Sequence, residues 1–113
     1  QLYEDWASET RERLLALYLR AADRLAGTLI RRGQNADGLA VCQLILSRDA
    51  CWERAYRLMM GAYARQGNQP QAHRVYQRCV AALRAELDVA PSPATVALFQ
   101  RLTEFGDLDS VDV

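Results

Sequence analysis

Side chains that carry enzymatic or metal chemistry are few in this sequence. It holds three cysteines and one histidine, His73. A zinc site needs four ligands at short spacings, and no other ligands stand at suitable spacings from His73. The sequence also lacks a glycine-rich phosphate loop and a Ser/His or Cys/His pairing suited to nucleophilic catalysis. We therefore predict a protein that is not an enzyme and that binds no metal or cofactor.

The pattern of the cysteines is typical of structural residues. Cys42, Cys51 and Cys79 are odd in number and irregular in spacing, which does not favour a disulfide framework. Cys42 and Cys79 fall at apolar positions of expected helices, so we predict buried, reduced thiols; a disulfide or a metal site is the alternative. Reduced thiols fit a cytoplasmic location best.

Arginine is the one chemically informative residue type, because all fourteen basic residues are arginine. On a helix that advances 100° per residue, two groups each fall on one narrow face, about 60° wide for the first. The groups are Arg20, Arg24, Gly27 and Arg31, and then Arg54, Arg57, Gly61 and Arg65. Guanidinium groups bind carboxylates in bidentate fashion. We therefore predict a shared groove that binds an acidic peptide, for instance a segment like 107–113, with the glycines keeping the groove open. The alternative is that these arginines are solvated charges paired with Asp23 or Glu53.

The elements that position these arginines repeat along the chain. Shifting the sequence by 34 residues superimposes seven identical positions: Arg20/Arg54, Ala21/Ala55, Gly27/Gly61, Arg31/Arg65, Gly33/Gly67, Val41/Val75 and Gln43/Gln77. A 34-residue unit of helix, turn and helix is typical of tetratricopeptide arrays, in which neighbouring units stack to bury their apolar faces. We predict an all-α, tetratricopeptide-like right-handed stack of helical hairpins, about five helices long. In such a stack the first helices of successive repeats line the concave face, where both arginine groups would lie.

The helices are expected at 3–32, 36–47, 50–66, 69–87 and 93–105. Asn35, Asp49 and Asn68 are the expected N-caps of the second, third and fourth helices. Gly38 indicates a close crossing near Ala26. The fifth helix would cover the open end of the second repeat, Gly106 would end it, and 106–113 would be a short, mobile acidic tail. Residues 1–105 would thus form one domain.

Charge and length bound the function further. Residues 11–84 carry thirteen arginines against five carboxylates, whereas both flanks are acidic. The basic middle makes direct nucleic-acid binding the alternative function, although few aromatic side chains are interleaved there for base stacking. The 113 residues are half hydrophobic and a quarter charged, an ordinary globular composition, and no apolar run is long enough to cross a bilayer. Because the sequence starts at Gln1 without a signal-peptide pattern, we expect a piece of a longer polypeptide.

Several segments resemble a known family, the bacterial transcriptional activator domain. The similar segments are Tyr3-Glu-Asp-Trp6, Arg11-Glu-Arg-Leu14 and Tyr18-Leu19 at the start, Ala55 to Met60 with Tyr63 in the middle, and Ala85 to Thr95 followed by Leu98 to Leu102 at the end. The Pro91-Ser-Pro93 stretch is the most specific. Asp88 and Gly38 depart from the pattern, which favours glycine and alanine at these positions.

This resemblance implies an all-helical module that usually follows a winged-helix DNA-binding domain in regulators of antibiotic pathways and related bacterial systems. It implies roles in self-association, signal coupling and transcriptional activation. We therefore expect a protein–protein interaction and regulatory module, a possible homodimer, that contacts DNA only through a separate domain and does not contact a membrane. The resemblance assigns no catalytic residue.

Overall fold

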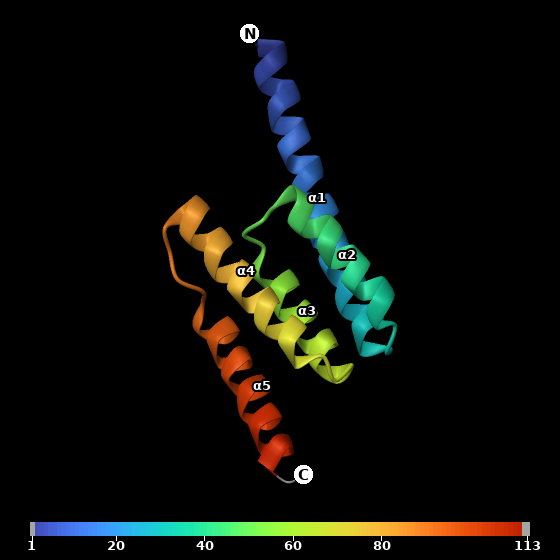
Figure 1. The fold of residues 1–113 in the computed structure, drawn as a ribbon. Helices are drawn as coiled ribbons and strands as arrows, with labels where there is room; N and C mark the ends of the chain where they lie inside the picture. Colours follow the sequence, from blue (N-terminus) through green and yellow to red (C-terminus); the bar gives the residue numbers. More distant parts are fainter. Residues whose placement is uncertain (1, 112–113) are drawn as a thin grey trace.

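The computed structural model describes the backbone of residues 2–111 and the side chains of residues 2–104. Five α-helices account for nearly all of it: α1 (Leu2–Arg31), α2 (Asn35–Arg48), α3 (Glu53–Arg65), α4 (Gln69–Leu87) and α5 (Pro93–Val111) (Figure 1). No strand occurs within residues 2–111. The all-α fold with about five helices is confirmed. None of the helices in this part of the chain is long and apolar enough to span a membrane.

The helices pair as the 34-residue period predicts. α1 packs on α2, α3 packs on α4, and α2 lies against α3 to join the two hairpins, while α5 contacts α3 and α4. The two hairpin turns are built alike, because Gly33 and Gly67 both have positive φ, 81° and 75°. In the first turn the Gln34 N–H donates to the Leu29 carbonyl oxygen at 2.9 Å, and in the second the Asn68 N–H donates to the Tyr63 carbonyl oxygen at 2.9 Å. This is the conformation that favours glycine after a helix.

One predicted helix start is confirmed and two are wrong. The Asn68 side chain caps α4 by accepting a hydrogen bond from the Gln71 amide at 3.3 Å. Asn35 is the first residue of α2 rather than its cap, and its side-chain oxygen is buried without a partner among the described residues. Asp49 does not cap α3, which begins four residues later. Its amide instead ends α2 by donating to Ile45, and its carboxylate accepts from the Cys51 amide at 2.9 Å.

The C-terminal helix is longer than predicted. Gly106 lies inside α5 and does not end it, since the helix continues to Val111. A single glycine within a helix costs only about 1 kcal/mol, and no proline follows to interrupt the hydrogen bonds. Residues 112 and 113 of the expected acidic tail lie outside the described part, and the mobility of 106–113 stays a prediction.

One apolar core runs through both hairpins. Its fully buried members include Ala26, Ile45, Met59, Met60 and Val75. Cys42 and Cys79 are buried as well, and Cys51 is half-buried, so the predicted burial of Cys42 and Cys79 is confirmed, while their reduced state stays a prediction. Burial raises the pKa of both buried thiols from 9.0 to about 11.

Two contacts set how the helices pack. At Gly38 an added Cβ would collide with Ile30 and lie 3.4 Å from the Ala26 carbonyl oxygen, so the predicted close crossing of α1 and α2 is present. α5 is held on α4 by Phe99, whose ring stacks on Tyr76 at a centroid distance of 3.9 Å and forms a T-shaped pair with His73 at a centroid distance of 4.9 Å.

The molecule is elongated. Its radius of gyration is 16.4 Å, whereas a compact chain of this length would measure about 13 Å. The first half of α1 accounts for part of the difference, because it projects away from the other helices (Figure 1). The first buried residue of α1 is Leu19.

Candidate functional site: an arginine-lined groove

A hollow of about 370 Å³ lies between α3 and α5, closed at one side by the end of α1. Four guanidinium groups surround an aliphatic floor in it. The lining residues are Ile30, Arg54, Arg57, Leu58, Gly61, Arg65, Ala94, Leu98 and Arg101. We call this hollow the arginine groove. α1, α3 and α5 are the first helices of successive units, so the groove lies on the side where the repeat pattern predicts the arginines.

The structure brings together only part of the predicted set. The whole α3 group, Arg54, Arg57, Gly61 and Arg65, lines the groove. Of the α1 group, Gly27 and Arg31 adjoin it, because a Cβ on Gly27 would lie 2.7 Å from an Arg54 nitrogen and 3.4 Å from an Arg31 nitrogen.

Arg20 and Arg24 do not join the groove. Arg20 lines a separate hollow with Leu15, Asp49 and Trp52. Arg24 is exposed and lines neither hollow. Only the last turn of α1 reaches the groove, and Arg20 stands about 15 Å before Ile30 along the helix axis.

The two repeated glycines have different surroundings. The space above Gly27 is filled by the side chain of Arg54, and the residue is buried. At Gly61, no heavy atom of the described residues would lie within 4 Å of an added Cβ, so the groove is open there. The prediction that glycines keep the groove open therefore fits Gly61 and not Gly27.

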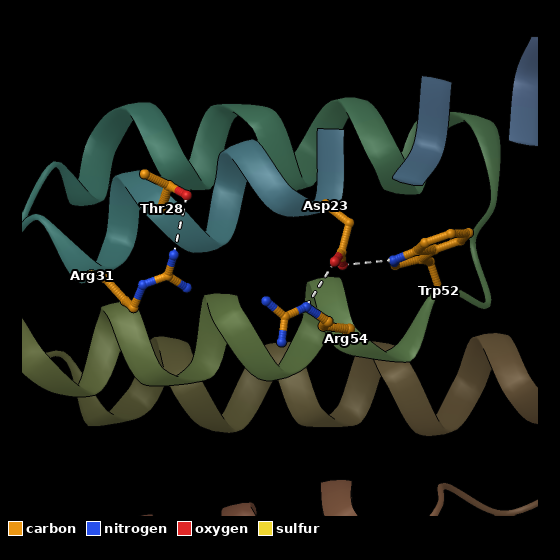
Figure 2. A network of polar contacts seen from close by, with 5 residues as sticks. All are labelled: Asp23, Thr28, Arg31, Trp52 and Arg54. Carbon is orange, nitrogen blue, oxygen red and sulfur yellow. Dashed lines mark hydrogen bonds and ion pairs between the residues drawn. The ribbon is translucent and has the colours of Figure 1, made fainter. Parts of the chain in front are cut away.

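Arg54 is the most firmly held of the arginines. Its Nε donates to Asp23 at 2.8 Å, and the other carboxylate oxygen of Asp23 accepts from Trp52 Nε1 at 3.0 Å (Figure 2). Asp23 is only 16% exposed, so water screens this pair less than it screens a pair on the open surface. For Arg54 the alternative, an ion pair with Asp23, is what the structure shows. The contact ties α1 to α3.

Arg57 belongs to a network that holds the start of α5. It donates to the Thr95 hydroxyl at 2.9 Å, and that hydroxyl donates to Glu53 at 2.7 Å. The Ser92 amide donates to the same Glu53 oxygen at 3.0 Å. Burial by itself acts to raise the pKa of Glu53, but the hydrogen bonds from Thr95 and Ser92, helped by the charge of Arg57, outweigh it and hold the pKa below its ordinary value.

The remaining arginines are less engaged. Arg65 donates to the backbone carbonyl of Ile30 at 3.1 Å, which satisfies a terminal acceptor of α1. Arg31 donates to the Thr28 hydroxyl at 3.2 Å. Among the described side chains, no carboxylate lies within ion-pair distance of Arg31, Arg65 or Arg101. These three cations therefore retain charge that an anionic ligand could neutralise.

Arg101 and Thr95 belong to the site without having been identified in it from the sequence, and Glu53, expected only as an ion-pair partner of the arginines, accepts hydrogen bonds from Ser92 and Thr95. Arg101 follows Arg65 by 36 residues, so the 34-residue period does not reach it. Glu53 and Thr95 are 42 residues apart and meet only because α5 folds onto α3. The only sequence signal for Arg101 is that it is a basic residue on the face of the fifth helix that turns towards α3.

The side chains that line the groove define what it offers a ligand. It offers guanidinium donors and aliphatic contacts, and its described lining contains no nucleophile or general base. Across residues 2–104, no group of histidine, cysteine or carboxylate side chains is arranged to hold a metal ion.

The sequence was compared with curated proteins and with protein-family models. No curated protein matches the sequence. Residues 2–103 match the bacterial transcriptional activator domain, which covers both hairpins and most of α5. Asp88, at the end of α4, has a φ of 52°, the left-handed conformation that glycine adopts most readily. On the strength of a match over nearly its whole length, the chain belongs to the bacterial transcriptional activator domain family.

Proposed function

We propose that this domain is a protein-interaction and regulatory module of a bacterial transcription regulator, and that its arginine groove binds an acidic peptide segment of a partner protein. The observation that carries the proposal is the set of three arginines, Arg31, Arg65 and Arg101, at or beside an aliphatic hollow with no carboxylate partner among the described side chains. The module would work in the cytoplasm, and DNA contact would come from a separate domain.

The groove defines the ligand by its chemistry. Guanidinium groups favour carboxylates over neutral or basic partners. The floor, formed by Ile30, Leu58 and Leu98, favours apolar side chains between those carboxylates. A volume of about 370 Å³ accommodates a few side chains rather than a folded domain. An acidic segment with interspersed leucine or valine fits these requirements.

The acidic end of the same molecule is a poor occupant. Residues 107–111 continue α5, and Figure 1 shows the C-terminus at the end of that helix farthest from its start. Val111 lies about 15 Å beyond Arg101 along the helix. A segment of another molecule is therefore the better candidate.

Nucleic-acid binding through the same arginines is less well supported. Single-stranded nucleic acids bind to basic grooves that also offer aromatic rings for stacking, and the lining of this groove is aliphatic. Three of its four guanidinium groups already have a protein partner: Arg54 bonds to Asp23, Arg57 to Thr95 and Arg65 to the Ile30 carbonyl. The remaining positive charge is small for a surface that must follow a phosphate backbone.

A labelled peptide with the sequence of residues 105–113, which mixes carboxylates with apolar side chains, is a suitable probe for fluorescence anisotropy. Arg65→Ala combined with Arg101→Ala should weaken its binding at least tenfold. The matched control is Arg74→Ala combined with Arg78→Ala, two exposed arginines of α4 outside the groove. Arg54 is left intact in this test because its loss would leave Asp23 without its cation.

A second variant tests the location. Gly61→Leu would place a side chain in the hollow and should reduce binding, whereas Gly61→Ala should not. If the peptide bound the wild-type, Arg65/Arg101 and Gly61→Leu proteins with equal affinity, the proposal that it binds in the arginine groove would be refuted. Salt-dependent binding of an oligonucleotide, lost in the Arg65/Arg101 variant while the peptide does not bind, would establish the nucleic-acid alternative instead.

A further inference from the structure

Equivalent positions of the two repeats differ sharply in burial. Ala55 and Met59 of α3 are fully buried, and α2 packs against α3. Their equivalents 34 residues earlier, Ala21 and Leu25, lie on the surface of α1, and Leu25 is 50% exposed. Within the described residues no hairpin precedes the first repeat to cover this face, whereas α5 covers the opposite end of the stack. Helical repeats bury such faces against a neighbouring helix.

The uncovered face of the first hairpin contains a hollow. α1 and α2 enclose a shallow hollow of about 260 Å³ there, lined almost entirely by apolar atoms. We call it the α1–α2 face, and its residues are Tyr18, Ala21, Ala22, Leu25, Val41 and Leu44. Leu44 is 54% exposed. The arginine groove involves none of these residues, so the two surfaces are separate.

The projecting half of α1 is the second unpartnered element. Residues 2–18 contain no buried side chain, although Tyr3, Trp6 and Leu14 are 76%, 64% and 59% exposed. This segment is about 25 Å long. One apolar stripe about 40° wide runs from the projecting half onto the α1–α2 face. Its members are Tyr3, Ala7, Leu14, Ala21 and Leu25.

We propose that two copies of this chain associate through an antiparallel pairing of their α1 helices, in which residues 2–18 of each copy cover the α1–α2 face of the other. The stripe is self-complementary in this arrangement. If Leu14 lies opposite Leu14 of the second copy, then Ala7 lies opposite Ala21 and Tyr3 opposite Leu25. The second copy's helix then takes the place on α1 that α2 takes on α3, which is also antiparallel.

The charges of α1 select this orientation. Residues 2–18 carry four carboxylates and two arginines, whereas residues 19–31 carry three arginines and one carboxylate. Antiparallel pairing sets the acidic half of each helix against the basic half of the other, while a parallel pairing would set like against like. A second copy therefore satisfies both the apolar pattern and the charge pattern with one symmetric contact.

Sedimentation equilibrium of the 113-residue chain over a concentration series tests the association. The expected result is a monomer–dimer equilibrium whose dissociation constant rises at least tenfold with Leu14→Glu and with Leu25→Glu, and rises moderately with salt. Both residues are at least half exposed in the single chain, so folding should survive, as circular dichroism can verify. Leu87→Glu is the control, because Leu87 is 59% exposed but lies at the end of α4.

Disulfide cross-linking tests the register. In a Cys51→Ser background, which leaves only the two buried cysteines, Leu14→Cys should oxidise to a covalent dimer because the two thiols face each other. Glu12→Cys, on the opposite side of α1, should remain monomeric. A monomer at every concentration, a dimer indifferent to Leu14→Glu and Leu25→Glu, or equal cross-linking at positions 12 and 14 would overturn the proposal. Because these variants leave the arginine groove intact, peptide binding in the same proteins reports on the proposed function separately.

Discussion

Gly38 and Gly61 both lie inside helices, and helix propensity assigns both the same free-energy cost relative to alanine. Their surroundings differ. A Cβ on Gly38 would collide with Ile30, whereas a Cβ on Gly61 would meet no described atom within 4 Å. Gly38→Ala should therefore destabilise the fold by about 1–3 kcal/mol because the α1–α2 crossing must open. Gly61→Ala should stabilise it by about 0.5–1 kcal/mol through helix propensity.

Urea unfolding monitored by circular dichroism measures both effects. Both variants gain helix propensity, but only Gly38→Ala introduces a collision. Gly61→Ala therefore measures the propensity gain by itself. Shifts of the unfolding midpoint in the same direction for the two variants would contradict the packing shown by the structure.

How far individual residues could be predicted depends on whether their role is set along one helix or between helices. The advance of 100° per residue placed Arg54, Arg57, Gly61 and Arg65 on one helix face, and all four line the same hollow, because the angular position of a residue on a helix follows from spacing alone. Spacing does not reveal that Arg54 forms an ion pair with Asp23, or that Arg20 lies outside the arginine groove. Those outcomes depend on the angle and offset at which α1 crosses α3, and spacing encodes neither.

At the scale of elements, α5 is fastened to α3 by one carboxylate. Glu53 accepts hydrogen bonds from the Ser92 amide and the Thr95 hydroxyl, and Thr95 is fully buried. The folded state lowers the pKa of Glu53 below its ordinary 4.5. The stabilisation is therefore fully present above about pH 4.5 and is lost as the pH falls through the lower folded-state pKa, because the unfolded chain binds the proton first.

This sign leads to a prediction for Glu53→Gln. The variant should be less stable than the wild type at pH 7, because an amide is a weaker acceptor than a carboxylate. The gap between the two should narrow below about pH 4.5, as the wild-type carboxylate becomes protonated. Urea midpoints at several pH values measure this, with Glu12→Gln as the control, since Glu12 is exposed on α1. A gap that is independent of pH would show that Glu53 does not fasten α5 through its charge.

Element boundaries are predictable where a local signal fixes them. α4 spans the predicted residues because Asn68 caps it with its own side chain. The predicted start of α3 is three residues too early, because Asp49 holds the Cys51 amide in the loop and Trp52 bonds to Asp23 of α1. The predicted end of α5 rests on a glycine, but a glycine ends a helix reliably only when it adopts a positive φ, as Gly33 and Gly67 do.

At the scale of the whole molecule, the two hairpins share one core rather than having one each. Cys42 of the first hairpin and Cys79 of the second belong to the same buried cluster, and both are fully buried. The hairpins are also linked outside the core by the Asp23–Arg54 ion pair and by the bond from Arg65 to the end of α1. A repeat protein with strong interfaces between units unfolds as one cooperative system.

The thiols make this cooperativity measurable. At pH 8 only about one in a thousand molecules of a thiol with a pKa near 11 is ionised, so Cys42 and Cys79 should not react with iodoacetamide until the surrounding helices separate. If the hairpins open together, pulse labelling followed by mass spectrometry of each peptide should give one urea midpoint for both cysteines. Cys51 is the internal reference, because it is half-buried at the junction between α2 and α3 and should be labelled at lower urea. Labelling of Cys42 at a distinctly lower urea concentration than Cys79 would mean that the first hairpin opens alone, which is the behaviour expected if its uncovered outer face, rather than the shared core, governs its stability.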